Sequence, residues 1–249
     1  MPSGDAGENT REQPALVGFP LVKRGADTMK EKLRPHGLSL ALFGFFIIFQ
    51  LGLSGVGQRH YNHEQIQHGQ PTVGYVEYIA SAGFLEATME NWESEFLQMF
   101  AYVLMTALLF QKGSAESKNP DQPEAVDRDP RESRNKKDAP WPVRRGGVVL
   151  KIYENSLALT LFLLFLISFM LHAIGGASEY SDQQIAHGGQ AVTVFQYLGT
   201  AQFWFESLQN WQSEFFSIAI LVVLSIFLRQ KGSPESKPVD SPHSMTGHE

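Results

Sequence analysis

Two stretches without a charged side chain constrain the fold more than any other feature of the chain. No Asp, Glu, Lys or Arg occurs in residues 35–58 or in residues 155–178, each 24 residues long. About 20 apolar residues are enough for a helix to cross the hydrocarbon core of a bilayer. The sequence therefore predicts an all-α membrane protein rather than a soluble domain. Its isoelectric point of about 5.8 argues against a basic nucleic-acid-binding face.

Two shorter uncharged runs, residues 96–111 and 215–228, predict two further spans. Each run is preceded by a tryptophan and followed by Lys or Arg, as is typical of a helix that ends at the two membrane interfaces. The expected interface anchors are Trp92, Trp211, Lys112, Arg229 and Lys231. We expect four transmembrane helices, at about 37–57, 92–111, 155–176 and 211–229.

The chain repeats itself at a constant offset of 119 residues. Of the 83 positions in residues 36–118, 30 are identical to those in residues 155–237, without a gap. Each repeat holds two expected spans, an even number, so both repeats begin on the same side of the membrane. The predicted fold is a pair of parallel-repeat helical hairpins with partly helical outer loops.

The segments outside the repeats are polar. The first 32 residues have no apolar core, and the linker after the first repeat combines prolines with mixed charges. We expect a disordered arm over 1–32, repeat 1 over 33–118, a flexible charged cytoplasmic linker over 119–150, repeat 2 over 151–237 and a disordered tail over 238–249. Either Met1 or Met29 could be the start of translation.

Basic residues predict the orientation. Arg59 is the only Lys or Arg in the two loops that join the spans within each repeat, whereas those loops carry ten acids. The positive-inside rule puts the arm, the linker and the tail in the cytoplasm, and loops 58–95 and 177–214 outside. Within the loops, glycines after His68 and His187 indicate helix ends, and Ser81 and Thr200 are suited to cap the helices that follow.

Several polar residues are candidates for an ion path or for structural contacts. Glu95 and Glu214 occupy equivalent positions near the expected hydrocarbon, where a carboxylate is costly and often functional. Asn91 and Asn210 are also equivalent and could hydrogen-bond between helices. The alternative is that all four are simply solvated at the depth of the lipid headgroups.

The outer loops also contain possible metal ligands. His60, His63 and His68 correspond to Glu179, Asp182 and His187 in the second repeat, so each position holds a ligand-type residue in both copies. Imidazole and carboxylate groups suit zinc and other divalent ions. The spacing matches no standard motif, so surface residues are the alternative interpretation. His172 lies within the third span without an evident second histidine to hold a haem.

The motifs of this chain resemble an uncharacterised family of small bacterial multi-pass membrane proteins, a domain of unknown function. The resemblance covers about residues 33–237, and it implies a location in the bacterial cytoplasmic membrane but no activity. It rests on 37-GLSLA-41, 68-HGQP-71, 90-ENWESEFLQ-98, 112-KGSAESK-118, 140-PWPVRRG-146, 209-QNWQSEF-215 and 232-GSPESK-237.

Three functions remain open from the sequence. The first is a non-enzymatic membrane scaffold or accessory component, because nucleotide-binding and catalytic motifs are absent. The second is a small cation or proton transporter or channel that acts as an oligomer. The third is a metal-binding protein that uses the outer-loop histidines. We expect no other cofactor and no nucleic acid; the expected partners are the lipid bilayer, a second copy of the chain or another membrane protein.

Overall fold

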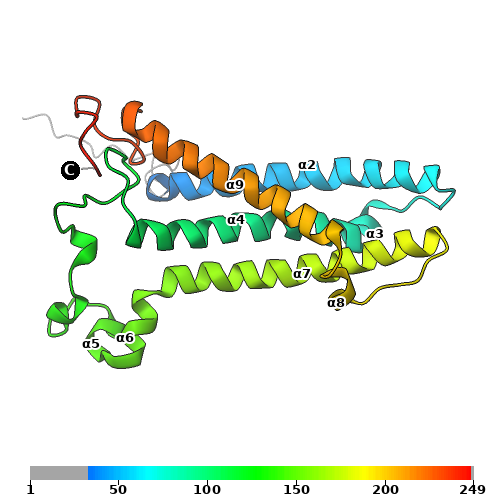
Figure 1. The fold of residues 1–249 in the computed structure, drawn as a ribbon, viewed down its shortest axis with the longest axis horizontal. Coiled ribbons are helices and arrows are strands. Elements are labelled where there is room, and N and C mark those ends of the chain that lie inside the picture. Colours follow the sequence, from blue (N-terminus) through cyan, green and yellow to red (C-terminus); the bar gives the residue numbers. More distant parts are fainter. Residues whose placement is uncertain (1–32, 248–249) are drawn as a thin grey trace, which may run out of the picture. The chain divides into compact units, whose positions relative to one another are not determined.

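A computed structural model describes residues 33–247, so the arm expected over 1–32 and both candidate start methionines lie outside the described residues. The described chain is helical and contains no strand. Its long helices are α2 (Gly37–Gln67), α4 (Ala82–Leu108), α7 (Ser156–Ala186) and α9 (Ala201–Phe227) (Figure 1). The short elements are η1 (Arg34–His36), α3 (Tyr75–Ile79), η2 (Ala125–Asp127), η3 (Pro130–Ser133), α5 (Trp141–Arg145), α6 (Gly147–Glu154) and α8 (Val194–Tyr197).

Three helices in the described part of the chain are long and apolar enough to cross a membrane. They are Arg34–Gln67, Ser156–Ala186 and Ala201–Phe227. The expected span over 92–111 is not among them. It falls on α4, where Asn91, Glu93 and Glu95 precede an apolar stretch that ends with the helix at Leu108. The helices thus support a membrane protein, but four spans are not confirmed.

The chain divides into two compact units, Met1–Leu53 and Ser54–Glu249. The described part of the first unit is η1 and the first half of α2. Large apolar side chains are exposed there, with exposed fractions of 68% for Phe43 and 70% for Phe49. A helix that is apolar on all sides is typical of a membrane span, in which lipid covers such side chains.

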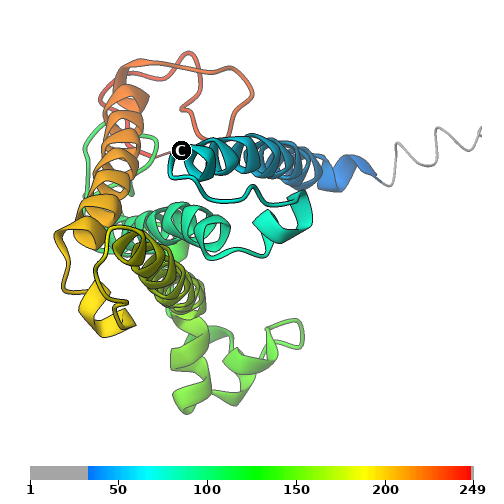
Figure 2. The same cartoon turned by 90° about the vertical axis from the view of Figure 1, so that its right-hand side faces the viewer.

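The second unit is built on α4, α7 and α9. Helix α4 packs along α7 and also contacts α9, which crosses it (Figures 1 and 2). Gly175 lets α7 approach closely, because a Cβ atom there would lie 2.9 Å from the backbone nitrogen of Glu86. The core beside this contact is formed by Ala173, Ala177, Tyr197 and Phe203.

The connections at one end of the long helices follow the expected capping pattern. The side chains of Ser81 and Thr200 accept hydrogen bonds from the backbone N–H groups of Phe84 and Phe203, so both predicted N-caps are confirmed. The predicted helix-ending glycines, Gly69 and Gly188, have φ angles of 67° and 80°. The glycines were expected to end short helices over residues 61–68 and 180–187. These segments are not separate helices, because α2 continues to Gln67 and α7 to Ala186.

The opposite end contains short helices and contacts between polar segments. The linker, expected to be flexible, contains η2, η3 and α5, and Lys118 pairs with Asp127 at 2.6 Å. The tail beyond residue 237 contacts the loop after α4. There the Gly113 N–H donates to the Thr246 hydroxyl at 2.8 Å, and the Gly247 N–H donates to the Ser114 carbonyl at 3.0 Å. Hydrogen bonds between the tail and the loop after α4 thus hold these two polar segments together without an apolar core.

Candidate functional site: a buried histidine among four carboxylates

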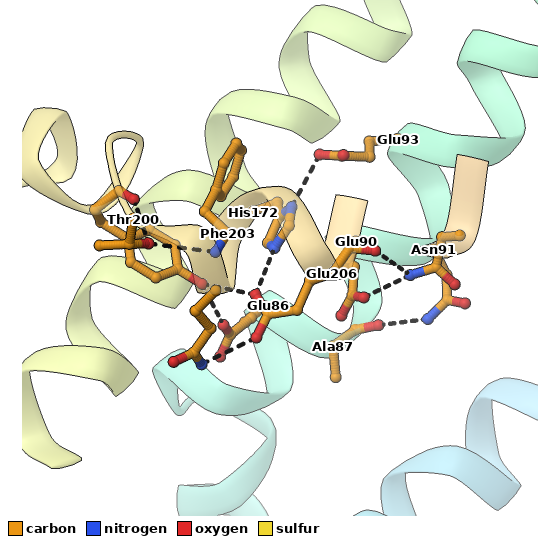
Figure 3. A network of polar contacts seen from close by, with 12 residues as sticks. Glu86, Ala87, Glu90, Asn91, Glu93, His172, Thr200, Phe203 and Glu206 are labelled. Carbon is orange, nitrogen blue, oxygen red and sulfur yellow. Dashed lines mark hydrogen bonds and ion pairs between the residues drawn. The ribbon is translucent and has the colours of Figure 1, made fainter. Parts of the chain in front are cut away.

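A histidine and a glutamate are completely buried between α7 and α4. The Nδ1 atom of His172 lies 2.9 Å from the Glu93 carboxylate, and neither side chain has exposed surface (Figure 3). The indole N–H of Trp211, on α9, donates to the other Glu93 oxygen at 3.1 Å. An ionised carboxylate only accepts hydrogen bonds. An ionised Glu93 would thus accept hydrogen bonds from the His172 Nδ1–H group and from the Trp211 indole, donors that come from two helices.

The second ring nitrogen of His172 faces two more carboxylates. Its Nε2 atom is buried without a hydrogen-bond partner and lies 3.7 Å from Glu206 of α9, just beyond hydrogen-bonding distance. One ligand-type atom from each of Glu86, His172 and Glu206 lies within 4.8 Å of the others. Glu86 comes from α4, so three helices meet at this point.

A tyrosine and a glutamine hold these two acids in place. The Tyr197 hydroxyl lies 3.1 Å from Glu86 and 2.8 Å from Glu206, so it can donate to either carboxylate. The Gln202 side chain donates to the other Glu206 oxygen at 3.0 Å. Glu86 precedes the part of α4 that was expected to cross the membrane. Burial, followed by the nearby Glu206 charge, raises the pKa of Glu86 to about 7.

A fourth carboxylate lies at the edge of the cluster. Glu90, one turn after Glu86 on α4, accepts a hydrogen bond from the side chain of Asn210. The equivalent Asn91 is exposed, and its side chain donates to the Ala87 carbonyl of its own helix. Of the two asparagines singled out in the sequence, Asn210 therefore links two helices and Asn91 does not.

The cluster contains more negative than positive charge. Four glutamates surround one histidine, and α3, α4, α7, α8 and α9 contain no Lys or Arg. Burying an unpaired charge is costly unless it is neutralised or compensated by a partner. The arrangement therefore favours bound positive charge, as protons or as a metal ion.

Other residues singled out in the sequence lie outside this cluster. Glu95 is exposed on α4, and Glu214 is half-buried on α9, beyond the cluster towards the C-terminal end of that helix. Trp211, which stays a predicted interface anchor, donates a hydrogen bond to Glu93. Arg229 donates to carbonyl groups at the end of α9, so it caps that helix.

The proposed outer-loop ligands are partly brought together. The rings of His68 and His187 lie 5.9 Å apart between centroids, and both line a cavity of about 560 Å³ with Glu179 and Asp182. His60 and His63 do not line this cavity. The first lies 3.5 Å from Glu64 and the second hydrogen-bonds to Gln67, each one turn along α2.

The sequence analysis missed most of the cluster. Glu86, Glu90 and Glu93 follow one another at intervals of four and three residues, which places them on one face of a helix. That spacing was the available indication. Equivalence between the two repeats does not indicate the cluster, because the positions equivalent to His172, Glu93, Glu206 and Glu86 hold Leu53, Gln212, Ala87 and Phe205.

The fold and this cluster define a class: an all-helical protein with three helices able to span a membrane and a buried acidic site between helices of its second unit. A family profile described as a domain of unknown function, DUF6766, matches residues 29–248, so the chain belongs to that family. No curated protein and no solved structure matches the chain.

Proposed function

We propose that this protein moves a cation across a bacterial cytoplasmic membrane and that the His172 cluster is the site where the cation binds. The observation that carries the proposal is the charge of the cluster, four carboxylates and one imidazole without a basic residue. Of these groups, His172 lies within an expected span, where ionisable side chains are expensive and typically mark ion pathways or proton relays. A bound cation would offset the excess negative charge.

The proposed topology has four spans, α2, α4, α7 and α9, with both termini in the cytoplasm and loops 58–95 and 177–214 outside. For α4, the support is its packing along α7, with Glu93 turned towards that helix rather than towards lipid. The near absence of basic residues from the two loops supports the orientation. With this orientation, three of the four glutamates lie in the outer parts of α4 and α9 beyond the expected spans, and Glu93 and His172 lie near the outer ends of the second and third spans.

The proposed duplication is supported by contacts that recur at the 119-residue offset. Tyr61 and Tyr78 lie 5.6 Å apart between ring centroids, and so do Tyr180 and Tyr197. Asn62 hydrogen-bonds to the backbone of Val73 as Ser181 does to that of Val192. Two parallel hairpins with the same internal contacts are what such a repeat predicts.

Polar side chains continue beyond the cluster in the direction of the other membrane face. Gln98 on α4 and Ser168 on α7 are both buried. Near the ends of α4 and α9, the Tyr102 hydroxyl donates to Glu116 at 2.6 Å, and Ser114 contacts Ser225 at 2.7 Å. Four helices enclose little space for a path, so we propose that the protein works as an oligomer.

Ion flux into liposomes tests this proposal. The purified full-length chain is reconstituted into vesicles that contain a pH-sensitive dye or a dye sensitive to divalent metal ions. We expect one of these cations to enter under an inward gradient and Glu206→Gln to lose most of the flux. Glu95→Gln is the matched control, because this exposed acid lies on α4 outside the cluster. Vesicles as tight as protein-free ones to protons and metal ions would contradict the proposal.

A scaffold or accessory role is the second candidate. The observation that favours it is the assembly formed by the C-terminal tail and the loop after α4, in which Lys237 is buried and donates to the carbonyl groups of Gly113, His243 and Met245. Such an ordered surface at the cytoplasmic end would suit a partner protein. A protein without cation flux that retains a membrane partner on affinity purification would fit this role.

A further inference from the structure

We propose that Glu86, His172 and Glu206 are the ligands of a divalent transition metal ion such as Zn²⁺. This inference rests on the proposed function for the role of the metal as the transported cation. The ligand set itself is argued from the geometry. Imidazole and carboxylate groups together suit Zn²⁺ and its first-row neighbours, whereas Mg²⁺ and Ca²⁺ prefer oxygen ligands alone.

The spacing of the three groups is close to what a metal ion requires. Bonds of 2.0–2.2 Å in a tetrahedral site separate neighbouring ligand atoms by about 3.4 Å. The Nε2 atom of His172 lies 3.7 Å from the nearer Glu206 oxygen, and an atom of each of the three ligands lies within 4.8 Å of the others.

The buried, unpartnered nitrogen is independent evidence for a ligand. His172 has no exposed surface, and its Nε2 atom has no hydrogen-bond partner. In the neutral tautomer whose Nδ1–H group donates to Glu93, the Nε2 lone pair faces Glu206 and Glu86. A metal ion between these three groups would offset the repulsion among them.

Glu93 and Trp211 supply the support that a metal-binding histidine usually has. Histidine ligands commonly donate their other ring N–H to a carboxylate, which fixes the tautomer and the ring orientation. Glu93 accepts this bond at 2.9 Å and is itself held by the Trp211 indole at 3.1 Å. Glu93 is therefore a positioning residue rather than a ligand.

Three protein ligands leave a fourth coordination position open. Catalytic and exchangeable zinc sites have this composition, whereas structural zinc sites usually have four protein ligands. Two ionised glutamates also balance the charge of a divalent ion. An open position and a neutral site both allow an ion to enter and leave, as a transported ion must.

Metal analysis of the purified full-length protein tests the site. We expect one equivalent of Zn²⁺ to remain after dialysis against buffer with added zinc, and X-ray absorption to show one imidazole and two carboxylate ligands. His172→Gln should abolish the imidazole signature and stoichiometric binding. The matched control is His63→Gln, which changes an exposed histidine hydrogen-bonded to Gln67; this variant should bind Zn²⁺ as the wild type does.

A second set of variants covers the case in which His172→Gln does not fold. Glu93→Gln keeps an acceptor for the Nδ1 proton and removes the charge. It should weaken zinc binding by roughly 10–100-fold with the imidazole signature retained. Glu86→Gln and Glu206→Gln should each remove one carboxylate ligand, while Glu95→Gln should leave the affinity unchanged.

The outcomes separate this inference from the proposed function. Protein that binds no stoichiometric metal would overturn the inference. Metal that is lost when His68 and His187 are replaced, but kept in Glu206→Gln, would overturn it as well. Proton flux through such metal-free protein would leave the proposed function standing, with a protonated His172 between Glu93 and Glu206. Zinc bound at these three ligands without any cation flux would instead support the site and contradict transport.

Discussion

The Nδ1 atom of His172 lies 2.9 Å from the carboxylate of Glu93, and both side chains are fully buried between α7 and α4. This contact links two helices through residues that are 79 positions apart in the sequence. The pair therefore contributes both to the packing of the helices and to the polarity of the site.

Replacing one residue of this pair should destabilise the protein more than replacing both. Glu93→Leu leaves His172 and the Trp211 indole without their acceptor and should cost about 1.5–3 kcal/mol in the free energy of unfolding, as for other hydrogen bonds to a charged group. The double variant Glu93→Leu/His172→Leu should recover part of that loss. Reversible unfolding in detergent, arranged as a double-mutant cycle, measures the coupling, and strictly additive effects would contradict it.

The close approach of α7 to α4 should not tolerate a side chain at Gly175. A Cβ atom there would lie 2.9 Å from the backbone of Glu86, so Gly175→Ala should lower stability by about 1–3 kcal/mol. Gly44→Ala is the matched control within a helix, because nothing lies within 4 Å of its Cβ position. Thermal unfolding of the two variants should separate them, and equal melting temperatures would show that the helices are not in contact at this glycine.

Lys118 and Lys237 occupy equivalent positions in the two repeats but should differ in their effect on the tail. Lys237 is buried and donates to carbonyl groups of Gly113 and of the tail, whereas Lys118 pairs with Asp127. Lys237→Met leaves buried carbonyls unsatisfied and should release residues 238–247. We expect faster hydrogen exchange of the Gly247 amide in this variant and not in Lys118→Met.

The expected topology can be tested because the chain has no cysteine. A cysteine introduced at Ala125 should react with a membrane-impermeant maleimide only after the cells are opened. One introduced at Gln67 should react in intact cells, because the outer loops are expected to face away from the cytoplasm. Labelling at position 125 from outside would reverse the proposed orientation.

Glu95 and Glu214 were candidates for an ion path from the sequence, and their role is still to be tested. Because Glu95 is exposed and both lie outside the cluster, replacing both by Ala should leave cation flux and folding nearly unchanged. Flux measured in the liposome assay and gel-filtration profiles would check this. A loss of flux in the folded double variant would restore these two acids to the ion path.

The sequence predicted the helices better than the site. Charge-free stretches and capping residues are local features, so the two longest helices and the caps at Ser81 and Thr200 follow from them. The partners of His172 come from two helices distant in sequence. The spacing of Glu86, Glu90 and Glu93 places them on one face of α4, but no local pattern shows which helices that face meets. Residues shared by both repeats indicate Glu95 and Glu214. They do not indicate Glu206, because its equivalent position holds Ala87.

The contacts of the polar end segments were equally hard to foresee. Prolines and mixed charges in residues 119–150 predict a flexible tether, which stays a prediction. The tail hydrogen-bonds to a loop more than 120 residues earlier, as where the Gly113 N–H donates to the Thr246 hydroxyl. Composition carries no information about such pairing.

The cluster residues have no equivalents at the matching positions of the other repeat, and this affects the number of ions that one chain could bind. Leu53, Ala87, Phe205 and Gln212 occupy the positions that correspond to His172, Glu206, Glu86 and Glu93, so the internal repeat supplies the framework twice and the ligands once. If Glu86, His172 and Glu206 bind a metal ion as proposed, each polypeptide would hold one such ion, and no second ion would bind at the equivalent positions of the first repeat. Any cooperativity between ions would have to arise between chains.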